Sequence, residues 1–264
     1  MRYTPTPVKP PLMKKEQKMN KIESITSLQN ARVKKWTSLH TKKGRDETGL
    51  FLVEGEHLIS EALKAGILET LIIDEENPFD FDNVIQVTPE IMKKVSQNVS
   101  AVHLIGVCQR KEPTVSDMSR VILLDGVQDP GNVGTMIRTA VSFGFDTVYC
   151  SPDTCDLYND KAIRSTQGAL FHIPVIRGNL ADLIAQLRND GFRIIATTLE
   201  HSKTMSEIEN KGKLAFVFGN EGSGVSKAIQ QDADERLRIE MEGFESLNVA
   251  VAAGIVMYHY QRNL

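Results

Sequence analysis

From Arg120 onwards, strand-like apolar runs alternate with segments of helical period, and this alternation constrains the fold more than any other feature. The run at 120–126, RVILLDG, has no polar break until its end, which is typical of a strand covered on both faces. Further elements are expected as strands at 146–150, 172–177, 193–199, 214–219 and 237–241, and as helices near 132–143, 161–170, 179–191, 225–231 and the C-terminus. This order predicts an α/β domain over residues 120–264, with a mostly parallel sheet and helices on both faces.

A shorter series of the same kind comes first. Its expected elements are strands at 51–55 and 68–74, a helix at 57–66, and two further pieces at 88–95 and 103–108. They predict a small α/β domain over residues 47–110. Residues 111–119, KEPTVSDMS, are the predicted linker between the two domains.

The N-terminal segment is basic. Residues 19–46 are predicted to be a helical arm, in which Val33, Trp36 and Leu39 share one side of a short helix. Residues 1–18 contain four of the ten prolines and no apolar period, so we expect disorder or an extension there. Residues 1–46 carry 12 Lys or Arg against 3 Asp or Glu, in a chain of net charge −3. This asymmetry indicates an anionic polymer as partner, and a solvated tail is the equally supported alternative.

Composition excludes several classes of protein. With 264 residues, of which 41% are hydrophobic and 25% charged, the chain is typical of a soluble globular protein that needs no disulfide or metal staple. The three cysteines and six histidines show no metal-ligand spacing, so we expect no metal. The longest apolar stretch, 247–260, is too short to cross a bilayer, and no secretory signal is recognisable. We therefore expect a cytoplasmic protein with reduced thiols.

Three loops that follow predicted strands carry polar residues, and ligands of open α/β sheets bind at the carboxyl ends of strands. In the first loop, 125–140, a Pro-Gly turn leads to Asn132, which is placed to cap the helix that carries Arg138. In the second loop, 218–226, three glycines allow a ligand to approach the backbone, while Asn220 and Glu221 lie at the rim. Taken alone, an ordinary turn or a capped helix is the simpler interpretation of each loop.

The third loop, 241–254, contains Ser246 and Asn248 two residues apart, so both face one site only if the segment is still a loop or a first helical turn there. A serine that caps the final helix is again the simpler interpretation. The patterns G-x-x-x-x-G-K-[ST] and G-x-G-x-x-G do not occur in the sequence. Their absence argues against a Walker-type phosphoryl transferase and against a dinucleotide-dependent oxidoreductase.

In combination, the three loops indicate one family. The segments DGVQDPGNVG…IR (125–138), FGNEGSG (218–224) and SLNVAVA (246–252) occur in this order, and they resemble the signature motifs of the SpoU-type (TrmH-like) RNA ribose methyltransferases of the SPOUT superfamily. The resemblance covers residues 120–264, and residues 48–110 are similar to the small RNA-binding domain that often precedes this catalytic domain. It implies a deep trefoil knot, S-adenosylmethionine as cofactor, no metal, and a homodimer that completes each active site.

The resemblance also implies roles for particular residues. The implied cofactor-binding residues are Gly219, Asn220, Ile239, Met241 and Leu247. The implied catalytic residues are Asn132, Arg138, Glu221, Ser246 and Asn248. A ribose 2′-oxygen would attack the sulfonium methyl group, and we expect Arg138 to clamp a phosphate and stabilise the forming alkoxide, since a guanidinium is almost never neutral. Glu221 would hold Arg138 in place.

The expected substrate is RNA. The residues expected to contact its phosphates are Lys34, Lys35, Lys42, Lys43 and Arg45. Trp36 either stacks on a base or anchors its helix in the core. Ribosomal RNA is the expected substrate and transfer RNA the alternative, and a non-catalytic RNA-binding scaffold with the same fold is the rival from another class.

Overall fold

The chain folds around two separate β-sheets, one in each half. The computed structural model describes residues 22–242 and 246–262, so the extension expected at 1–18 lies outside the described residues. We refer to residues 22–109 as the N-terminal domain and to residues 120–262 as the C-terminal domain. Residues 110–119 join the two without helix or strand, and the linker over 111–119 stays a prediction.

The C-terminal domain contains a seven-stranded sheet in the order β10-β12-β9-β11-β6-β7-β8, and all neighbouring pairs run parallel. Its strands are β6 (Arg120–Asp125), β7 (Thr147–Cys150), β8 (Val175–Arg177), β9 (Phe192–Thr197), β10 (Lys203–Thr204), β11 (Lys213–Gly219) and β12 (Glu235–Arg238). Its α-helices are α5 (Pro130–Ser142), α6 (Asp160–Thr166), α7 (Leu180–Asn189), α8 (Lys227–Asp232) and α9 (Val249–His259). The predicted parallel α/β domain is confirmed, and the short edge strand β10 was not predicted.

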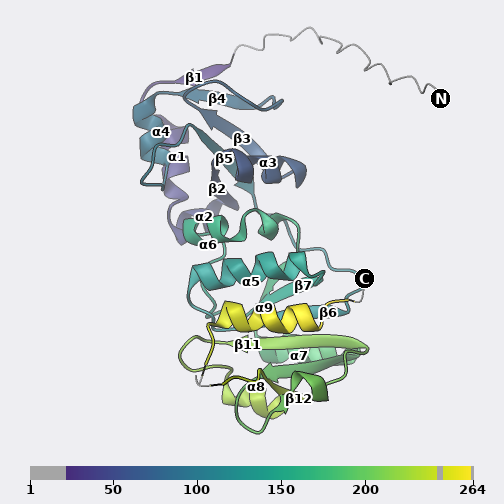
Figure 1. The fold of residues 1–264 in the computed structure, drawn as a ribbon. Helices are drawn as coiled ribbons and strands as arrows, with labels where there is room; N and C mark the ends of the chain where they lie inside the picture. The colour runs from purple at the N-terminus through teal and green to yellow at the C-terminus, as the bar shows by residue number, and fades with distance from the viewer. Residues whose placement is uncertain (1–21, 243–245, 263–264) are drawn as a thin grey trace, which may run out of the picture.

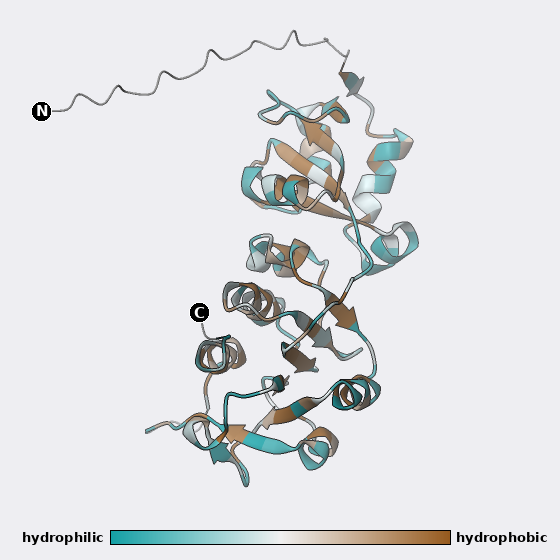
Figure 2. Ribbon diagram, turned by 90° about the vertical axis from the view of Figure 1, so that its right-hand side faces the viewer, coloured by the Kyte–Doolittle hydropathy of each residue, from teal (hydrophilic) through white to brown (hydrophobic). Residues whose placement is uncertain are grey.

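Side chains alternate across this sheet, and the alternation produces two helical layers. Along β6, Ile122 and Leu124 belong to the core cluster that contains residues of α5 and α9, whereas Val121 and Leu123 belong to the cluster with α7 and α8. All four side chains are fully buried, because a parallel strand between two helical layers has no exposed face. In Figure 2 many of the strands are accordingly brown, whereas some strands low in the view are largely teal.

The N-terminal domain contains a five-stranded mixed sheet in the order β1-β4-β3-β5-β2, in which β5 runs antiparallel to β2 and β3. Its strands are β1 (Glu23–Ile25), β2 (Leu50–Glu54), β3 (Leu68–Ile73), β4 (Val84–Val87) and β5 (Leu104–Gln109). Its helices are α1 (Ala31–Ser38), α2 (Lys42–Thr48), α3 (Glu56–Lys64) and α4 (Pro89–Val95). The predicted α/β character is confirmed, whereas β1 and β4 are too short to show a pattern of their own.

In the described residues 22–46, the basic segment is part of this domain rather than a separate arm. Its strand β1 pairs in parallel with β4, and α1 packs beside α4 on one face of the sheet. Val33 and Trp36 are buried in that cluster, and Trp36 is only 4% exposed. The expected apolar side of the helix is therefore confirmed. Trp36 is a core residue, and it is not available to stack on an RNA base.

The two domains share a continuous core. One hydrophobic cluster contains side chains of α3 and β2 together with those of α5, α6 and the C-terminal sheet. The ring of Phe51 lies 4.9 Å from that of Tyr158 and 5.9 Å from that of Phe171, measured between centroids. Gly168 permits this close docking, because a Cβ atom there would lie 2.7 Å from the Cβ of Glu61. Figure 1 shows α6 next to α2 at this junction.

A buried ion pair adds to the junction. Arg45, on α2, is 3% exposed, and its guanidinium donates to the Leu39 carbonyl at 2.6 Å and to the Asp156 carboxylate. Burial raises the pKa of Asp156, but the hydrogen bond from Arg45 and further contacts outweigh burial and leave the pKa below its ordinary value. The prediction that Arg45 contacts an RNA phosphate is therefore wrong, because its charge is already paired between the domains.

The trefoil knot implied by the resemblance depends on the path of the chain between β12 and α9. That path includes residues 243–245, which lie outside the described residues. The knot therefore stays a prediction. Within residues 22–242 and 246–262, no helix combines the length and apolar character needed to cross a membrane.

Candidate active site

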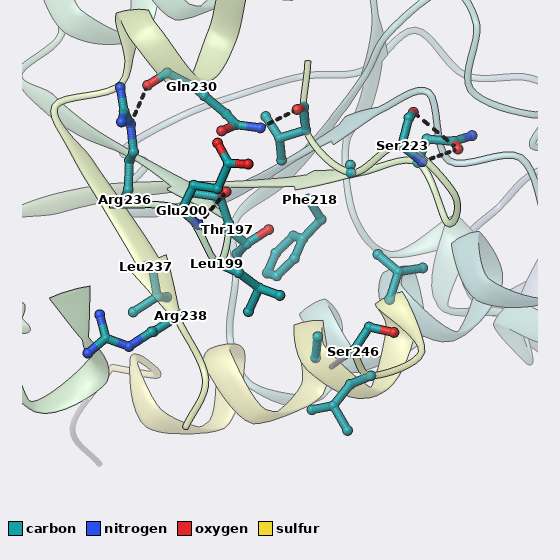
Figure 3. Close-up of a pocket in the computed structure, with 18 of the residues that line it drawn as sticks. Thr197, Leu199, Glu200, Phe218, Ser223, Gln230, Arg236, Leu237, Arg238 and Ser246 are labelled. Carbon is teal, nitrogen blue, oxygen red and sulfur yellow. Dashed lines mark hydrogen bonds between the residues drawn. The ribbon is translucent and has the colours of Figure 1, made fainter. Parts of the chain in front are cut away.

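A cavity of ≈ 950 Å³ lies at the carboxyl ends of β9, β11 and β12. Its walls come from four segments: 197–200 after β9, 218–231 after β11, 236–241 along and beyond β12, and 246–252 at the start of α9. Figure 3 shows Phe218 and Leu199 between the strand ends and Ser246 at the start of α9. The size and position are those of a cofactor pocket in a parallel α/β sheet.

The cavity is lined by all five residues that the resemblance assigned to the cofactor: Gly219, Asn220, Ile239, Met241 and Leu247. Apolar side chains such as Phe218, Leu199 and Leu237 share its walls with carboxamide, hydroxyl and carboxylate groups. Such walls suit a ligand that has a planar ring and several hydrogen-bonding groups. S-Adenosylmethionine has both features, so the residues present fit this cofactor.

The glycines of the second loop serve the loop itself. A Cβ atom on Gly219 would lie 2.0 Å from the Gly224 carbonyl carbon and from the Val225 nitrogen, so a larger residue would displace the loop. Gly224 has a φ of +70°, and its backbone exchanges hydrogen bonds of 2.9 and 3.1 Å with that of Asn220. These glycines thus close a tight loop beside the cavity, whereas the sequence suggested that they admit a ligand.

Glu221 is the centre of a hydrogen-bond cluster that joins all three loops. Its Oε1 accepts from Asn132 Nδ2 at 2.9 Å and from the Asp129 N–H at 3.0 Å, and its Oε2 accepts from the Gln128 N–H at 3.0 Å. Asn132 Oδ1 in turn accepts from Asn248 Nδ2 at 3.0 Å. We call Asn132, Glu221 and Asn248 the polar cluster. The structure thus brings together three of the five residues expected to be catalytic.

Glu221 is ionised at neutral pH. Burial, the largest single influence, raises its pKa, but the hydrogen bonds from Asn132 and from the N–H groups of Gln128 and Asp129 together outweigh burial and leave the pKa below its ordinary value. A carboxylate that accepts several hydrogen bonds is a poor proton acceptor. In this arrangement Glu221 organises the loops and orients Asn132.

The cap of α5 differs from the sequence interpretation. Asp129, and not Asn132, is the cap: its Oδ1 accepts from the N–H groups of Gly131 and Asn132 at 2.7 and 3.1 Å, and Pro130 opens the helix. An Asp followed by Pro is a recognised helix start and would have identified this cap. The other carboxylate oxygen of Asp129 pairs with Lys161 of α6 at 2.6 Å. That places a cation, which the sequence analysis did not single out, beside the polar cluster.

Ser246 and Asn248 precede the final helix, as a shared site requires, because α9 begins at Val249. Asn248 caps α9, with its Oδ1 accepting from the N–H groups of Ala250 and Val251 at 2.9 and 3.2 Å. The simpler interpretation, in which a serine is the cap, is therefore wrong. Ser246 is exposed and lines the cavity.

Arg138 does not join the polar cluster of its own chain. It follows Asn132 by six residues on α5, which corresponds to about 9 Å along the helix axis and about 120° around it. Its side chain is exposed and makes no hydrogen bond or ion pair to any residue in the described part of the chain. The expected contact between Glu221 and Arg138 is not formed, because Glu221 is occupied by Asn132 and the backbone of the first loop.

The N-terminal domain carries a basic surface. The lysines expected to contact RNA are all exposed: Lys34, Lys35, Lys42 and Lys43. Lys93 and Lys94, in the last turn of α4, are also exposed, and α4 packs beside α1. These two lysines were not among the residues expected from the sequence, although a Lys-Lys pair on the polar side of an amphipathic segment was a visible signal. We call these six lysines the basic surface.

Comparison with known proteins adds independent findings. The family model of the SpoU rRNA Methylase family matches residues 119–258, more than half of the chain, and the MRM3-like substrate binding domain matches residues 30–106. A curated relative is the 23S rRNA (guanosine(2553)-2′-O)-methyltransferase RlmP of Bacillus subtilis. It is 40% identical over 245 residues, which cover 90% of this chain and 99% of the relative.

Solved structures agree with this assignment. The AdoMet-bound rRNA methyltransferase from Sinorhizobium meliloti has a TM-score of 0.81 and 31% identity, over 90% of this chain and 97% of that chain. The SpoU methyltransferase AviRb from Streptomyces viridochromogenes, in complex with the cofactor AdoMet, has a TM-score of 0.77 and 26% identity, over 88% and 97%. Together with the three loops and the cavity that they border, these findings show that the chain belongs to the SpoU rRNA methylase family of SPOUT-class RNA 2′-O-methyltransferases.

Proposed function

We propose that this chain methylates the ribose 2′-hydroxyl of a guanosine in large-subunit ribosomal RNA, with S-adenosylmethionine as the methyl donor. Its family accounts for the class of reaction, S-adenosylmethionine-dependent 2′-O-methylation of RNA. The name of the B. subtilis relative, which specifies a guanosine of 23S rRNA, supports the substrate. The observation that carries the proposal is the polar cluster, whose Glu221 and Asn248 also line the cavity. A ribosomal substrate also supports a cytoplasmic location.

The cavity residues hold the methyl donor. Ile239, Met241 and Leu247 supply apolar walls, and Asn220 presents polar groups at the rim. When bound, S-adenosylmethionine supplies an electrophilic methyl group on a sulfonium centre. The protein then has two tasks, which are to orient the ribose hydroxyl and to accommodate its proton.

The polar cluster orients the ribose. Glu221 accepts from Asn132, and Asn132 accepts from Asn248, so each amide direction is fixed by its neighbour. Each side-chain NH2 group has a second hydrogen that remains for the substrate. Ser246, at the mouth of the cavity, adds a hydroxyl on the same side. This arrangement supports a role for all four side chains in positioning rather than in proton abstraction.

Arg138 acts as a phosphate clamp, contributed by the second protomer of a homodimer. Arg138 is exposed, and its position on α5 lies about 120° around the helix from that of Asn132. A planar guanidinium binds the phosphate next to the target ribose with two hydrogen bonds and stabilises the forming alkoxide. The proton then leaves through phosphate or water.

An apolar stripe on α9 supports the homodimer. Val251, Ile255 and Tyr258 lie on one side of this helix and are 51%, 36% and 64% exposed. The ring of Tyr258 packs against Phe143, just beyond the end of α5, at 5.7 Å between centroids. Exposed apolar residues that form a continuous stripe are typical of a protein interface. Because the stripe lies beside α5, a partner docked there would bring its own α5 close to the cavity.

The basic surface of the N-terminal domain contributes sequence-independent contacts to the RNA backbone. Six lysines from α1, α2 and α4 are exposed there, and cations of this kind bind phosphates without reading bases. The target nucleotide is then selected by the fold of the RNA around it. The N-terminal domain then provides affinity for the RNA, and the C-terminal domain transfers the methyl group.

The proposal is tested by transfer of a labelled methyl group from S-adenosylmethionine into total RNA from a strain that lacks this gene. Nuclease and alkaline digestion should leave a hydrolysis-resistant dinucleotide that contains a 2′-O-methylated guanosine from 23S rRNA. Label in tRNA instead would make tRNA the substrate. The absence of transfer, together with no binding of S-adenosylmethionine in calorimetry, would favour a non-catalytic RNA-binding scaffold.

A further inference from the structure

Arg177, the last residue of the edge strand β8, binds one loop at four points. Its acceptors are carbonyl oxygens of the loop that follows β7, residues 151–155, which we call the β7 loop. Nη1 donates to the carbonyls of Ser151, Pro152 and Thr154 at 2.8, 3.0 and 2.6 Å, and Nη2 donates to the carbonyl of Cys155 at 2.6 Å. A single side chain therefore sets the shape of the whole β7 loop.

The β7 loop in turn holds the first loop where that loop leaves β6. The Ser151 N–H donates to the Leu124 carbonyl at 2.9 Å, and the Ser151 hydroxyl accepts from the Gly126 N–H at 2.9 Å. The Thr154 hydroxyl donates to the same Leu124 carbonyl at 2.9 Å and lies 3.1 Å from the Ser151 hydroxyl. Backbone and side-chain contacts thus tie the two loops together at the carboxyl edge of the sheet.

Further hydrogen bonds connect the β7 loop to Gln128, the residue whose N–H contacts Glu221. The Cys155 N–H donates to the Val127 carbonyl at 3.0 Å, and Gln128 Nε2 donates to the Asp153 carbonyl. Gln128 then gives its own N–H to Glu221 at 3.0 Å. A continuous chain of hydrogen bonds therefore runs from Arg177 through the β7 loop to the carboxylate at the centre of the polar cluster.

We propose that Arg177 is a positioning residue for methyl transfer. By holding the β7 loop, it fixes the backbone at 124–128, so that the first loop meets Glu221 and Glu221 orients Asn132. The inference rests on the proposed role of the polar cluster in 2′-O-methylation. Arginine suits this position because its planar fork carries several donors at fixed angles, whereas a lysine ammonium is a compact group that cannot span four carbonyls in this way.

The effect of Arg177 falls on geometry more than on folding. Arg177 is an exposed residue at the end of an edge strand, and it lies outside the buried clusters. Water can reach the four carbonyls when the guanidinium is absent, so the loss of stability is limited. Small displacements of reacting groups, by contrast, reduce rates strongly, because methyl transfer needs the oxygen in line with the methyl group.

The test compares Arg177→Lys and Arg177→Gln with Arg188→Gln in steady-state and single-turnover methylation of the RNA substrate. Arg188 is the matched control, because it pairs with Asp232 on α8 at 2.9 Å and touches neither loop. Both changes at Arg177 should lower kcat by about tenfold or more, with the KM for RNA and the Kd for S-adenosylmethionine within about twofold of the parent values. Amide hydrogen exchange at 124–128 should also become faster, whereas the control should change neither property.

A kcat within twofold of the parent in Arg177→Gln, or unchanged amide exchange at 124–128, would overturn the inference. So would a parallel loss of cofactor affinity, since that would indicate general disruption. Thr154→Val provides a second route to the same chain, because it removes the hydroxyl bond to Leu124 and leaves Arg177 intact. Failure of the parent enzyme to methylate RNA would instead refute the proposed function, and amide exchange would still decide whether Arg177 holds the first loop.

Discussion

Asn248 donates from Nδ2 to Oδ1 of Asn132 at 3.0 Å, although the two residues lie 116 positions apart in the chain. The direction of this bond follows from Glu221, which is ionised and can only accept, so Asn132 must turn its NH2 group to Glu221 and its oxygen to Asn248. The three side chains therefore have one consistent arrangement of donors and acceptors. Changes that reverse a single polarity should disturb all three.

Asn132→Asp should replace the NH2 group that donates to Glu221 with an oxygen that can only accept. A carboxylate at 132 would face Glu221 at the 2.9 Å now spanned by a hydrogen bond, and two close carboxylates raise the pKa of one of them. We expect kcat to fall by about a hundredfold at pH 8 and to recover in part at lower pH, where the pair shares a proton. A pH profile of single-turnover rates measures this. A flat profile at the parental rate would contradict the assigned polarity.

Glu221→Gln should place an NH2 group opposite the N–H of Gln128 or of Asp129. Because Glu221 is exposed, water can replace the lost acceptor, and the free energy of unfolding should fall by only about 0.5–1 kcal/mol. The kcat should nevertheless fall by at least about tenfold. The Kd for S-adenosylmethionine should change less than kcat, because Glu221 is only one of the lining residues and the proposed cofactor residues Asn220, Ile239, Met241 and Leu247 are kept. Chemical denaturation and calorimetry check both quantities, with the exposed Glu76 changed to Gln as control. Equal kcat in the two variants would argue against the cluster.

Arg138→Ala and Asn248→Ala should each abolish methylation as homodimers, yet a mixture of the two should regain activity. If Arg138 serves the partner's site, each mixed dimer has one complete site, and random exchange of subunits gives about a quarter of the parental rate. Activity of refolded mixtures at several ratios measures this. If all groups act within one chain, mixing will restore nothing.

Alanine at Lys34, Lys35, Lys42 and Lys43 should weaken RNA binding mainly at low salt. Binding weakens as salt rises, so the slope of log K against log salt is negative. Each lost phosphate contact makes this slope less steep by about 0.7 to 0.9. Binding titrations at several salt concentrations measure the slope. A control change of two exposed lysines in the C-terminal domain, Lys211 and Lys213, should leave the slope unaltered. An unchanged slope in the four-lysine variant would show that the basic surface does not contact the RNA.

Arg45→Met should destabilise the chain by about 3–5 kcal/mol at neutral pH, because it leaves a largely buried Asp156 carboxylate without its partner. The folded-state pKa of Asp156 lies below its ordinary value of 3.8, so this contribution is present above that pH and is lost as the pH falls through the folded pKa. The difference between variant and parent should therefore shrink in acid. Urea denaturation at pH 7 and pH 3.5 measures both values, and a constant difference would be inconsistent with the ion pair.

The sheet of the C-terminal domain was predictable because buried parallel strands have continuous apolar runs and their helices keep a 3.6-residue period. Short edge strands such as β1 and β10 give no such signal, since two or three residues cannot establish a period. Arg45 was not predictable either. In a basic run it is indistinguishable from its neighbours, and only Asp156, 111 positions later, makes it a buried residue.

The candidate site was predictable in its residue types but not in its connections. Asn132, Glu221 and Asn248 were recognised from motif order alone, and the structure places them in contact. The expected contact between Glu221 and Arg138 is not formed, because six helical residues turn Arg138 away from Asn132. Arg177 was assigned only to a strand, since hydrogen bonds to backbone carbonyls leave no mark in the sequence of the loop that accepts them.

The cluster of Phe51, Tyr158 and Phe171 is buried only where the two halves of the chain meet. The N-terminal domain therefore cannot be exchanged between enzymes as an independent unit. Its removal would expose the aromatic side chains of the catalytic half that now pack against it. We expect related enzymes to reach new RNA targets by changes on exposed helices such as α1, α2 and α4. The aromatic cluster between the two domains would be kept. Because both halves share this cluster, we expect heat to unfold the protein in one cooperative transition instead of two.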